Sequence, residues 1–432
     1  MKIHDKNISE ILGLFESKGV FSQDLVNQYF KTFKDEDLEK IFKVTFYEEA
    51  ILKAKEIDAS REKGLKLGRL AGIPIIITDD ISTKGFLTTA GSKMLENYIP
   101  PFDASIIERL EGEDAIILGK LRINEFNLKA LEFPRDTSKF LPTIVGSQVN
   151  GHPVSIKPSY GLVSRYGVIS ATSSLDGIYI SGKSMEDMGL ILEIIGGYDE
   201  NDSTSVNIQT SSYSKQSDFP KEEVKISIPK DLLGFKDSRL DEFINCLRET
   251  ADLVEDISIE NIKYSSLAYR ILTSGEFASN TARYDGIGFG YRAGDYKDRE
   301  DLYKRSRSES FGLEAKKTII FGNYLIGSEG YDKYYRKSQQ IRTLIKGQVD
   351  KILGQSEFIL IPLINSMDKE SKDNYKSLAA LTGYPEIKIK FYIADKEEIQ
   401  LLLISKSFKE KDLLQLGYIL EEEILIKGEN NG

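Results

Sequence analysis

The stretch AGIPIIITDDISTKG, residues 71–85, decides how the rest of the sequence is interpreted. Four of the five residues from 73 to 77 are isoleucine. A short apolar run of this kind predicts a strand that is buried on both faces, as the strands of parallel sheets are. The run ends abruptly at Thr78, Asp79 and Asp80. Because the end of a buried strand holds its side chains rigidly, Thr78 occupies a position that suits catalytic work.

A second apolar run at residues 115–120 continues the pattern of the first. Residues 103–114 lie between the two runs and have helical periodicity, with Asp103 as the expected N-cap. A strand, a helix and a strand at this spacing predict a parallel pair that is joined by a crossover helix. We therefore expect the α/β class, with a sheet flanked by helices.

Amphipathic helices are predicted before this core. Residues 7–19, 21–33 and 46–64 repeat apolar side chains at helical spacing, and Ser22 stands where the second helix needs an N-cap. We expect these helices to pack on the α/β body that follows. The later sequence predicts a helix at 184–196, a strand at 224–230, long helices within 241–353, short strands at 358–363, 387–393 and 399–404, and a polar tail.

The composition is that of a soluble globular protein, with 40% hydrophobic and 29% charged residues. No apolar run approaches the length of a membrane-spanning helix, and the N-terminus lacks the apolar core of a signal peptide. We therefore expect a cytoplasmic protein that does not bind membranes. The lone Cys246 excludes an internal disulfide and a thiolate metal site, and two histidines, His4 and His152, are too few for a histidine-rich one. We expect neither a metal nor another cofactor.

The charge balance argues against nucleic acid as a direct partner. The formal net charge is −10, from 58 basic and 68 acidic side chains. Such a chain repels a phosphate backbone unless its basic residues gather on one face. Its charged clusters, such as SREK at residues 60–63, carry both signs and are typical of solvated helix faces. No segment rich in proline or glycine divides the chain, which favours a single interlocked domain.

Local motifs are weak when each is considered alone. GIGFGYRAG at residues 286–294 follows a helical segment instead of a strand, so we interpret it as an ordinary turn and not as a nucleotide loop. Asp79 and Asp80 could form an acid pair for a metal or for proton transfer, but adjacent carboxylates at a strand end more often serve a turn and a helix cap. His152 lies between a glycine and a proline, a context typical of an exposed turn.

Longer stretches carry a specific resemblance. Residues 71–126, 155–177, 274–292 and 331–346 closely resemble the amidase signature family, and within it the A subunits of glutamyl-tRNA(Gln) amidotransferases. The family fold that this implies is one large domain with a mixed sheet flanked by helices.

The resemblance also implies how the chain is divided. We expect a single amidase-like domain over residues 1–432, made of N-terminal helices at 1–65, a degenerate signature core at 70–200, and a helical and C-terminal strand part at 224–432. Between residues 127 and 155 the chain is a few dozen residues shorter than the family pattern. We therefore expect a shortened central region that has lost a helix and a central strand.

The family's catalytic residues are not found at their expected positions. The family hydrolyses amides with a neutral lysine, a serine in a cis peptide and a nucleophilic serine in a glycine-rich turn. Where the family reads IKDN, this chain has Thr78 at the lysine position, and a threonine cannot act as a general base near neutral pH. The block GGSSGGS is absent, and the remaining VGSQVNGHP puts Asn150 at a glycine of the oxyanion turn and His152 at the nucleophile. We expect no intact catalytic residue.

Positions that match the family's substrate contacts are retained. The resemblance implies that Arg342 and Asp373 hold the amino-acid end of a substrate and that Tyr291 lines the same pocket. An arginine can bind an α-carboxylate and an aspartate an α-ammonium group. The alternative is that Arg342 and Asp373 are surface ion-pair partners, which contribute little to stability.

These observations favour a degenerate homologue that acts by binding. Loss of a hydrolase's catalytic residues together lowers the rate on the order of a million-fold. The expected partners are the B and C subunits of the amidotransferase, or glutamine or a similar small amide. The alternative is an active amidase or glutaminase subunit of a tRNA-dependent amidotransferase with relocated machinery, such as Ser147 or His152 with a nearby lysine. A third alternative is a gene product without a role, against which the continuous reading frame argues.

Overall fold

The computed structural model describes residues 6–17, 19–132, 138–208, 212–213, 224–232, 244–245, 247–248, 252–393 and 397–430. The strands are β1 (Phe42–Thr45), β2 (Pro74–Thr78), β3 (Ile116–Leu121), β4 (Leu131–Glu132), β5 (Thr143–Gly146), β6 (Val149–Asn150), β7 (Val154–Lys157), β8 (Tyr179–Gly182), β9 (Lys225–Pro229), β10 (Asp252–Ile257), β11 (Phe358–Leu363), β12 (Glu386–Ile393) and β13 (Glu397–Ser405). The α-helices are α1 (Ile8–Glu16), α2 (Ser22–Asp35), α3 (Tyr47–Glu62), α4 (Ser105–Gly112), α6 (Met185–Ile195), α8 (Ser265–Asn280), α9 (Arg299–Ser310), α10 (Leu313–Ile326), α11 (Arg336–Leu353), α12 (Lys369–Lys376), α13 (Leu378–Thr382) and α14 (Glu410–Asn430).

A mixed sheet organises the described part of the chain. Its 11 strands follow the order β1-β3-β2-β5-β8-β7-β12-β13-β11-β9-β10. Strands β2 and β3 are parallel, which confirms the predicted strand, helix and strand unit. All five residues of β2 are buried, as its isoleucine-rich sequence predicts. The sheet is continuous across the shortened region, because β5 pairs with β2 and β8, and β7 pairs with β8 and β12.

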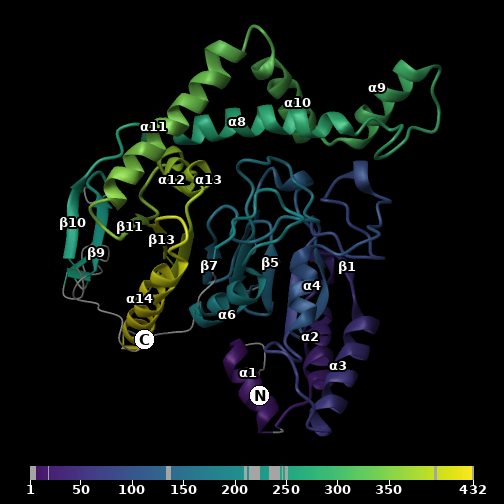
Figure 1. Cartoon of the computed structure of the whole chain (residues 1–432), viewed down its shortest axis with the longest axis vertical. Coiled ribbons are helices and arrows are strands. Elements are labelled where there is room, and N and C mark those ends of the chain that lie inside the picture. Colours follow the sequence, from purple (N-terminus) through teal and green to yellow (C-terminus); the bar gives the residue numbers. More distant parts are fainter. Residues whose placement is uncertain are drawn as a thin grey trace.

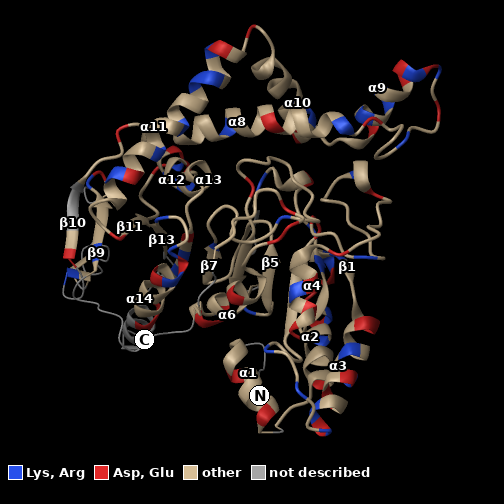
Figure 2. Ribbon diagram, viewed as in Figure 1, with Lys and Arg blue, Asp and Glu red and all other residues tan. Residues whose placement is uncertain are grey.

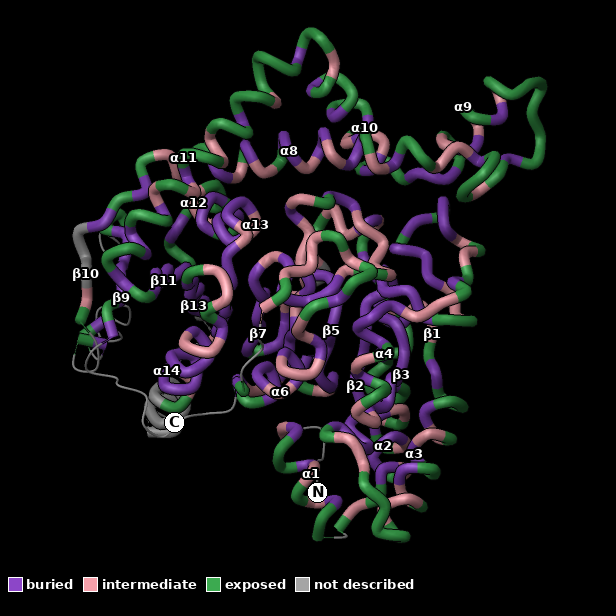
Figure 3. The backbone as a smooth tube through the Cα atoms, viewed as in Figure 1, coloured by how far each residue is buried: buried purple, intermediate pink, exposed green. Residues whose placement is uncertain are grey.

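Helices cover the sheet and bury its side chains (Figure 1). Helix α3 packs on β3, while α6 contacts β7, β8, α4 and α14. The N-terminal helices therefore lie against the α/β body, as predicted. Figure 3 shows β2, β5 and β7 buried, whereas parts of α9 and α10 are exposed. Acidic and basic residues alternate along α3 and α9 in Figure 2, in keeping with the interpretation of mixed-sign clusters as solvated helix faces.

A helical arm lies above the sheet in Figure 1. It consists of α8 together with α10 and α11, both of which pack on α8. An aromatic cluster joins the arm to the loop that follows β3. Phe126 of that loop contacts Phe277 of α8, with ring centroids 5.5 Å apart, and Phe311 beside α10, with centroids 6.2 Å apart. The arm is thereby fixed to the carboxyl-end side of the sheet.

Two predicted helix caps are wrong. Ser22 is the first residue of α2 and is not its N-cap. The carboxylate of Asp58, on α3, instead accepts hydrogen bonds from the backbone N–H groups of Ser22 and Gln23. Asp103 does not cap α4 but accepts the backbone N–H of Lys84. A distant carboxylate thus replaces the local cap of α2, and a distant backbone N–H engages the side chain that was expected to cap α4. A local pattern cannot predict such contacts.

The C-terminal tail was also predicted wrongly. It forms α14, and its Leu413, Leu414 and Leu420 are fully buried. Acidic and apolar residues are interspersed in this segment, and the burial of one face against β12 and β13 stabilises the helix. Strands β1 and β10 were not predicted either, since both are short segments whose charged residues lower their apolar content.

Gly146 ends β5 beside Thr78 of the neighbouring strand β2. Its φ is +144°, and a Cβ at this residue would lie 1.9 Å from Thr78 Oγ1. We therefore expect Gly146→Ala to lower the free energy of unfolding by about 2–4 kcal/mol, through overpacking and backbone strain. The measurement is denaturant unfolding monitored by tyrosine fluorescence.

The matched control for this prediction is Gly347→Ala within α11. A Cβ at Gly347 would meet nothing within 4 Å, so the substitution should be neutral or stabilising by about 0.5–1 kcal/mol through helix propensity. Equal effects of the two substitutions would contradict the proposed steric requirement at Gly146.

Candidate functional site

A hydrogen-bonded ring closes the carboxyl ends of β2 and β5. The Thr78 hydroxyl donates to Asp80 Oδ1, and the Ser147 hydroxyl donates to Asp80 Oδ2. The backbone N–H of Ser147 donates to Thr78 Oγ1 at 2.9 Å and completes the ring. All three residues are buried. We call these residues the Asp80 ring. Since β2 and β5 are parallel, their carboxyl ends meet at one edge of the sheet, where α/β proteins commonly bind ligands.

Burial dominates the electrostatics of the ring. It raises the pKa of Asp80, and the hydrogen bonds from Ser147 and Thr78 offset part of this rise. Lys120 of β3 lies in the same core, where burial lowers its pKa to about 8 against the opposing effects of Asp79 and Asp80. Its Nζ donates to Thr88 Oγ1 and, at 2.9 Å, to the carbonyl oxygen of Ile81. The desolvated lysine therefore makes no hydrogen bond to Ser147.

Asp79 has a structural role at the turn. Its carboxylate accepts hydrogen bonds from the backbone N–H and the hydroxyl of Thr89 and from the N–H of Gly91. Burial raises its pKa, and the contacts with Thr89 oppose that shift. The two adjacent carboxylates thus serve different purposes, since one fixes a loop and the other lies at the cavity floor. Neither of them caps a helix.

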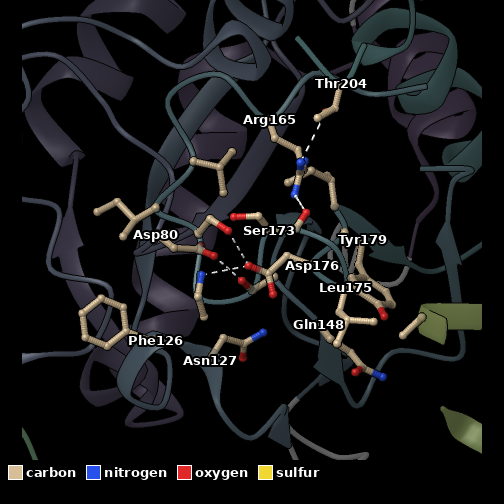
Figure 4. A pocket seen from close by; sticks show the side chains of 18 of the residues that line it. Asp80, Phe126, Asn127, Gln148, Arg165, Ser173, Leu175, Asp176, Tyr179 and Thr204 are labelled. Atoms are coloured by element: carbon tan, nitrogen blue, oxygen red, sulfur yellow. Dashed lines mark hydrogen bonds between the residues drawn. The ribbon is translucent and has the colours of Figure 1, made fainter. Parts of the chain in front are cut away.

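A cavity of about 620 Å³ opens above the Asp80 ring. Asp80, Ser147 and Gln148 contribute to its lining from the strand ends. Figure 4 shows Asn127 and Phe126 on one side and Arg165 on another, with Arg165 joined to Ser173 and Thr204. The remaining lining comes from Leu128 and Ala130, from the loop before β8 and the first residue of that strand, from residues 201–204, and from Tyr269 of α8 and Ala380 of α13.

Two polar atoms of the lining lack hydrogen-bond partners although they are buried. They are Oδ1 of Asn127 and Nε of Arg165. A buried polar atom of this kind is costly unless a partner satisfies it. Oδ1 of Asn127 is a hydrogen-bond acceptor, and Nε of Arg165 is a donor. Neither residue stands in a motif that the sequence marks as a site.

Arg342 of α11 holds the cavity wall and does not line the cavity. Its Nε donates to the carbonyl of Leu381 at 2.7 Å, and its Nη1 and Nη2 donate to Oγ and O of Ser174 at 2.9 and 3.0 Å. Ser174 also donates from its N–H and its hydroxyl to the carboxylate of Glu276. The flanking residues Ser173 and Leu175 line the cavity. Arg342 is therefore a positioning residue for this wall.

The other predicted substrate contacts lie elsewhere. Asp373 is exposed on α12 and is not part of the cavity lining. Tyr291 donates its hydroxyl to Glu309 at 2.9 Å, and Lys93 Nζ lies 4.4 Å from its ring centroid. It is likewise absent from the lining. The structure does not bring Arg342, Asp373 and Tyr291 into one pocket.

His152 is buried, which corrects the prediction of an exposed turn. Its exposed fraction is 4%, its Nδ1 has no partner, and its Nε2 lies 3.5 Å from the carbonyl oxygen of Leu141. Burial lowers the pKa of His152 to about 4, so the imidazole is neutral at pH 7. It does not line the cavity. The short connection between β6 and β7 turns the side chain inward.

Metal ligands and membrane helices were sought among the described residues. These contain no group of three or more His, Cys, Asp or Glu side chains placed to hold a metal ion. None of the helices in the described ranges combines the length and the apolarity that crossing a bilayer requires.

The mixed sheet, its helical layers and a hydroxyl-rich cavity at parallel strand ends define an α/β protein of the amidase class. The Amidase family profile matches residues 24–131 and 152–413. The chain therefore belongs to the amidase signature family, and both the predicted resemblance and the predicted fold class are confirmed.

Among named relatives, the chain is similar to the A subunits of glutamyl-tRNA(Gln) amidotransferases. It is 32% identical to the A subunit from Fusobacterium nucleatum, over 98% of this chain and 97% of the relative. It is 33% identical to A subunit 2 from Clostridium acetobutylicum, over 98% of this chain and 100% of the relative.

Solved structures show the same fold. The A subunit of glutamyl-tRNA(Gln) amidotransferase from Thermotoga maritima superposes with a TM-score of 0.72 at 24% identity and covers 96% of this chain and 94% of its own. The peptide amidase of Stenotrophomonas maltophilia superposes with a TM-score of 0.79 at 20% identity, over 98% of each chain.

The three hydrogen bonds of Arg342 generate a stability prediction. We expect Arg342→Gln to lower the free energy of unfolding by about 1–3 kcal/mol, because it leaves part-buried acceptors of Ser174 and Leu381 unpaired. The control is Arg336→Gln on the same helix, whose ion pair with Asp332 is exposed and should contribute less than about 1 kcal/mol. Denaturant unfolding of both variants checks this, and indistinguishable losses would contradict the positioning role.

Burial of His152 generates a pH prediction. The pKa falls from 6.5 to about 4 on folding, so the unfolded state binds the proton more readily. Stability contributed by the neutral imidazole is present above pH 6.5 and is lost as the pH falls toward 4, by on the order of 3 kcal/mol. His152→Gln should remove this part of the pH dependence, as measured by unfolding at pH 7, 6, 5 and 4. Parallel curves for the two proteins would refute the assignment.

Proposed function

We propose that this chain is a catalytically inert member of the amidase family that works by binding. In this proposal the cavity binds a small carboxamide, with glutamine as the reference ligand, and the protein acts together with partners that correspond to the B and C subunits of the amidotransferases. The relatives that share about a third of its sequence are named as subunits of such an enzyme.

The Asp80 ring is the observation that carries the proposal. A serine nucleophile needs a proton acceptor that is matched to the working pH, and enzymes of this kind surround it with a base and oxyanion donors. Here the Ser147 hydroxyl donates to a carboxylate whose other oxygen is occupied by Thr78. No nitrogen base of the described residues contacts this serine, since Lys120 bonds to Thr88 and His152 lies outside the lining.

The pattern of sequence matches supports the loss of the catalytic block. The family profile is interrupted between residues 131 and 152. The alignment with the Fusobacterium nucleatum relative spans 473 positions, which exceeds the 432 residues of this chain, so the relative has residues without a counterpart here. The interrupted region is the one in which the sequence lacks the serine- and glycine-rich block.

The chemistry of the lining supports a carboxamide ligand. Asn127 Oδ1 can accept from an amide NH2 group, and Arg165 Nε can donate to an amide oxygen. Both atoms are buried without partners, so a ligand that pairs with them gains hydrogen bonds at little further desolvation cost. In this proposal Asn127 and Arg165, and not Arg342 and Asp373, are the ligand contacts.

The exposed apolar surface of the arm supports partner proteins. Leu313 and Ile320 of α10 are 67% and 72% exposed, and Phe321 and Tyr324 nearby are 43% and 42% exposed. Large apolar side chains gathered on one exposed helix are typical of a protein–protein contact. This surface is the proposed contact with the partner subunits.

A second candidate function is amide hydrolysis with Ser147 as nucleophile and Asp80 as base. The hydrogen bond between them favours it, because the hydroxyl proton could pass to Asp80 as Ser147 attacks the amide carbon. The proton would then move to the leaving nitrogen, releasing ammonia and an acyl-enzyme that water cleaves. Burial raises the pKa of Asp80, which improves a carboxylate as a base.

Calorimetric titration with glutamine, run beside an ammonia-release assay, tests the proposal. We expect binding without ammonia, and we expect Asn127→Gly to weaken binding about tenfold through loss of a buried hydrogen bond. Glycine suits this position because the φ of Asn127 is +50°. The matched control is Asn323→Ala on exposed α10, which should bind glutamine normally.

Two results would overturn parts of the proposal. Ammonia release that disappears in Ser147→Ala, together with labelling of Ser147 by a fluorophosphonate, would establish the second candidate. Absence of glutamine binding in a folded sample would remove the carboxamide ligand and leave only the proposed contact with partner proteins.

A further inference from the structure

Strand β1 forms one end of the sheet. It pairs on one side with β3 in antiparallel register, and in the described part of the chain no strand lies on its other side. An edge strand presents unpaired backbone N–H and C=O groups that can add another strand. Proteins often protect such edges with charges or a covering element, so the surroundings of β1 indicate whether this edge is protected or available.

A groove of about 660 Å³ runs along this edge. Its walls are α2, the 3-10 helix η2 (Leu38–Ile41), β1 and the first residue of α3. Four aromatic side chains lie in contact at its base. Phe30 meets Phe33 and Tyr47 with centroids 5.7 and 5.0 Å apart, and Phe33 meets Phe42 at 4.9 Å. The groove therefore combines a free strand edge with an apolar floor.

Lysines dominate the charge of the groove. Its lining contains Lys31, Lys34 and Lys43 but only one carboxylate, Glu39. No carboxylate among the described residues pairs with any of the three lysines. Lys31 and Lys34 are exposed, and Lys43 belongs to the edge strand itself. Within the lining, basic side chains therefore outnumber acidic ones, while exposed acidic residues border the groove at 35–37 and 48–49.

We propose that this groove binds an extended acidic segment of another polypeptide, which adds to β1 as a further strand. Backbone hydrogen bonds to the edge of β1 would hold the segment, as in other strand-addition complexes. Alternate side chains of a strand point to opposite sides, so apolar residues reach the aromatic floor while acidic ones reach the lysines. The proposal is independent of the cavity and of its ligand.

Charge favours an acidic partner over a second copy of this chain. Pairing of two β1 edges would bring Lys43, Lys31 and Lys34 of both copies toward one another, and like charges at close range are unfavourable. An acidic strand meets the same side chains with opposite charge. The aromatic floor adds the apolar contact that charge alone does not supply.

Fluorescence anisotropy with three labelled peptides and the full-length protein tests the proposal. The probe is the peptide EVEVEVE, and its controls are KVKVKVK and EVEPEVE, whose proline interrupts strand pairing. We expect only EVEVEVE to bind, with an affinity that falls as salt is added. Lys31→Glu, Lys34→Glu and Lys43→Glu combined should weaken binding about tenfold or more.

A charge-matched variant separates local from global electrostatics. Lys55, Lys63 and Lys66 are exposed and lie outside the groove lining, so changing all three to Glu alters the net charge equally. We expect this control to bind EVEVEVE like the parent protein. Equal weakening in both triple variants, equal binding of the proline peptide, or no binding at all would overturn the proposal. A dimer by light scattering that the groove variant disrupts would assign the groove to a second copy instead.

Discussion

The Asp80 ring is the contact on which this site depends. A buried carboxylate at the junction of β2 and β5 is unfavourable unless its oxygens are satisfied. The hydroxyls of Thr78 and Ser147 each donate to one oxygen of Asp80, and the Ser147 N–H donates to Thr78 Oγ1. The absence of a side chain at Gly146 lets the two strand ends approach closely enough for these bonds. Removal of any one component leaves another buried polar group unpaired.

The sequence predicted the α/β class and the central parallel strands, because apolar runs and helical periodicity are local patterns. The isoleucines before Thr78 and the spacing to the next apolar run were sufficient for the parallel pair. The helix predicted at 184–196 is confirmed as α6, and Ser184 is its N-cap, whose hydroxyl accepts the N–H of Asp187. By contrast, the cap contributed by Asp58 and the burial of α14 arise from tertiary contacts, which periodicity does not contain.

The candidate site was less predictable than the fold. Thr78 was singled out from its position after a strand and Ser147 as a candidate for relocated catalytic machinery, and the structure brings the two together at one edge. Arg342, Asp373 and Tyr291 were grouped through family resemblance, but their side chains point to different surroundings. Asn127 ends the short 3-10 helix η4 (Glu125–Asn127) and Arg165 lies in a loop, and no local pattern specifies where either side chain points. His152 was misjudged because its flanking glycine and proline indicate a turn without indicating which way the side chain faces.

The Asp80 ring also limits the chemistry that the cavity can perform. Lys120, with its lowered pKa of about 8, is the most base-like lysine near the floor, but its hydrogen bonds tie it to the loop of residues 81–88. A lysine in place of Thr78 would have to be desolvated, and it would stay neutral only through a strongly lowered pKa. The threonine carries no charge, and its hydroxyl is fully used within the ring. The polar groups at the strand ends thus satisfy one another, and the Ser147 hydroxyl donates to a carboxylate of the ring.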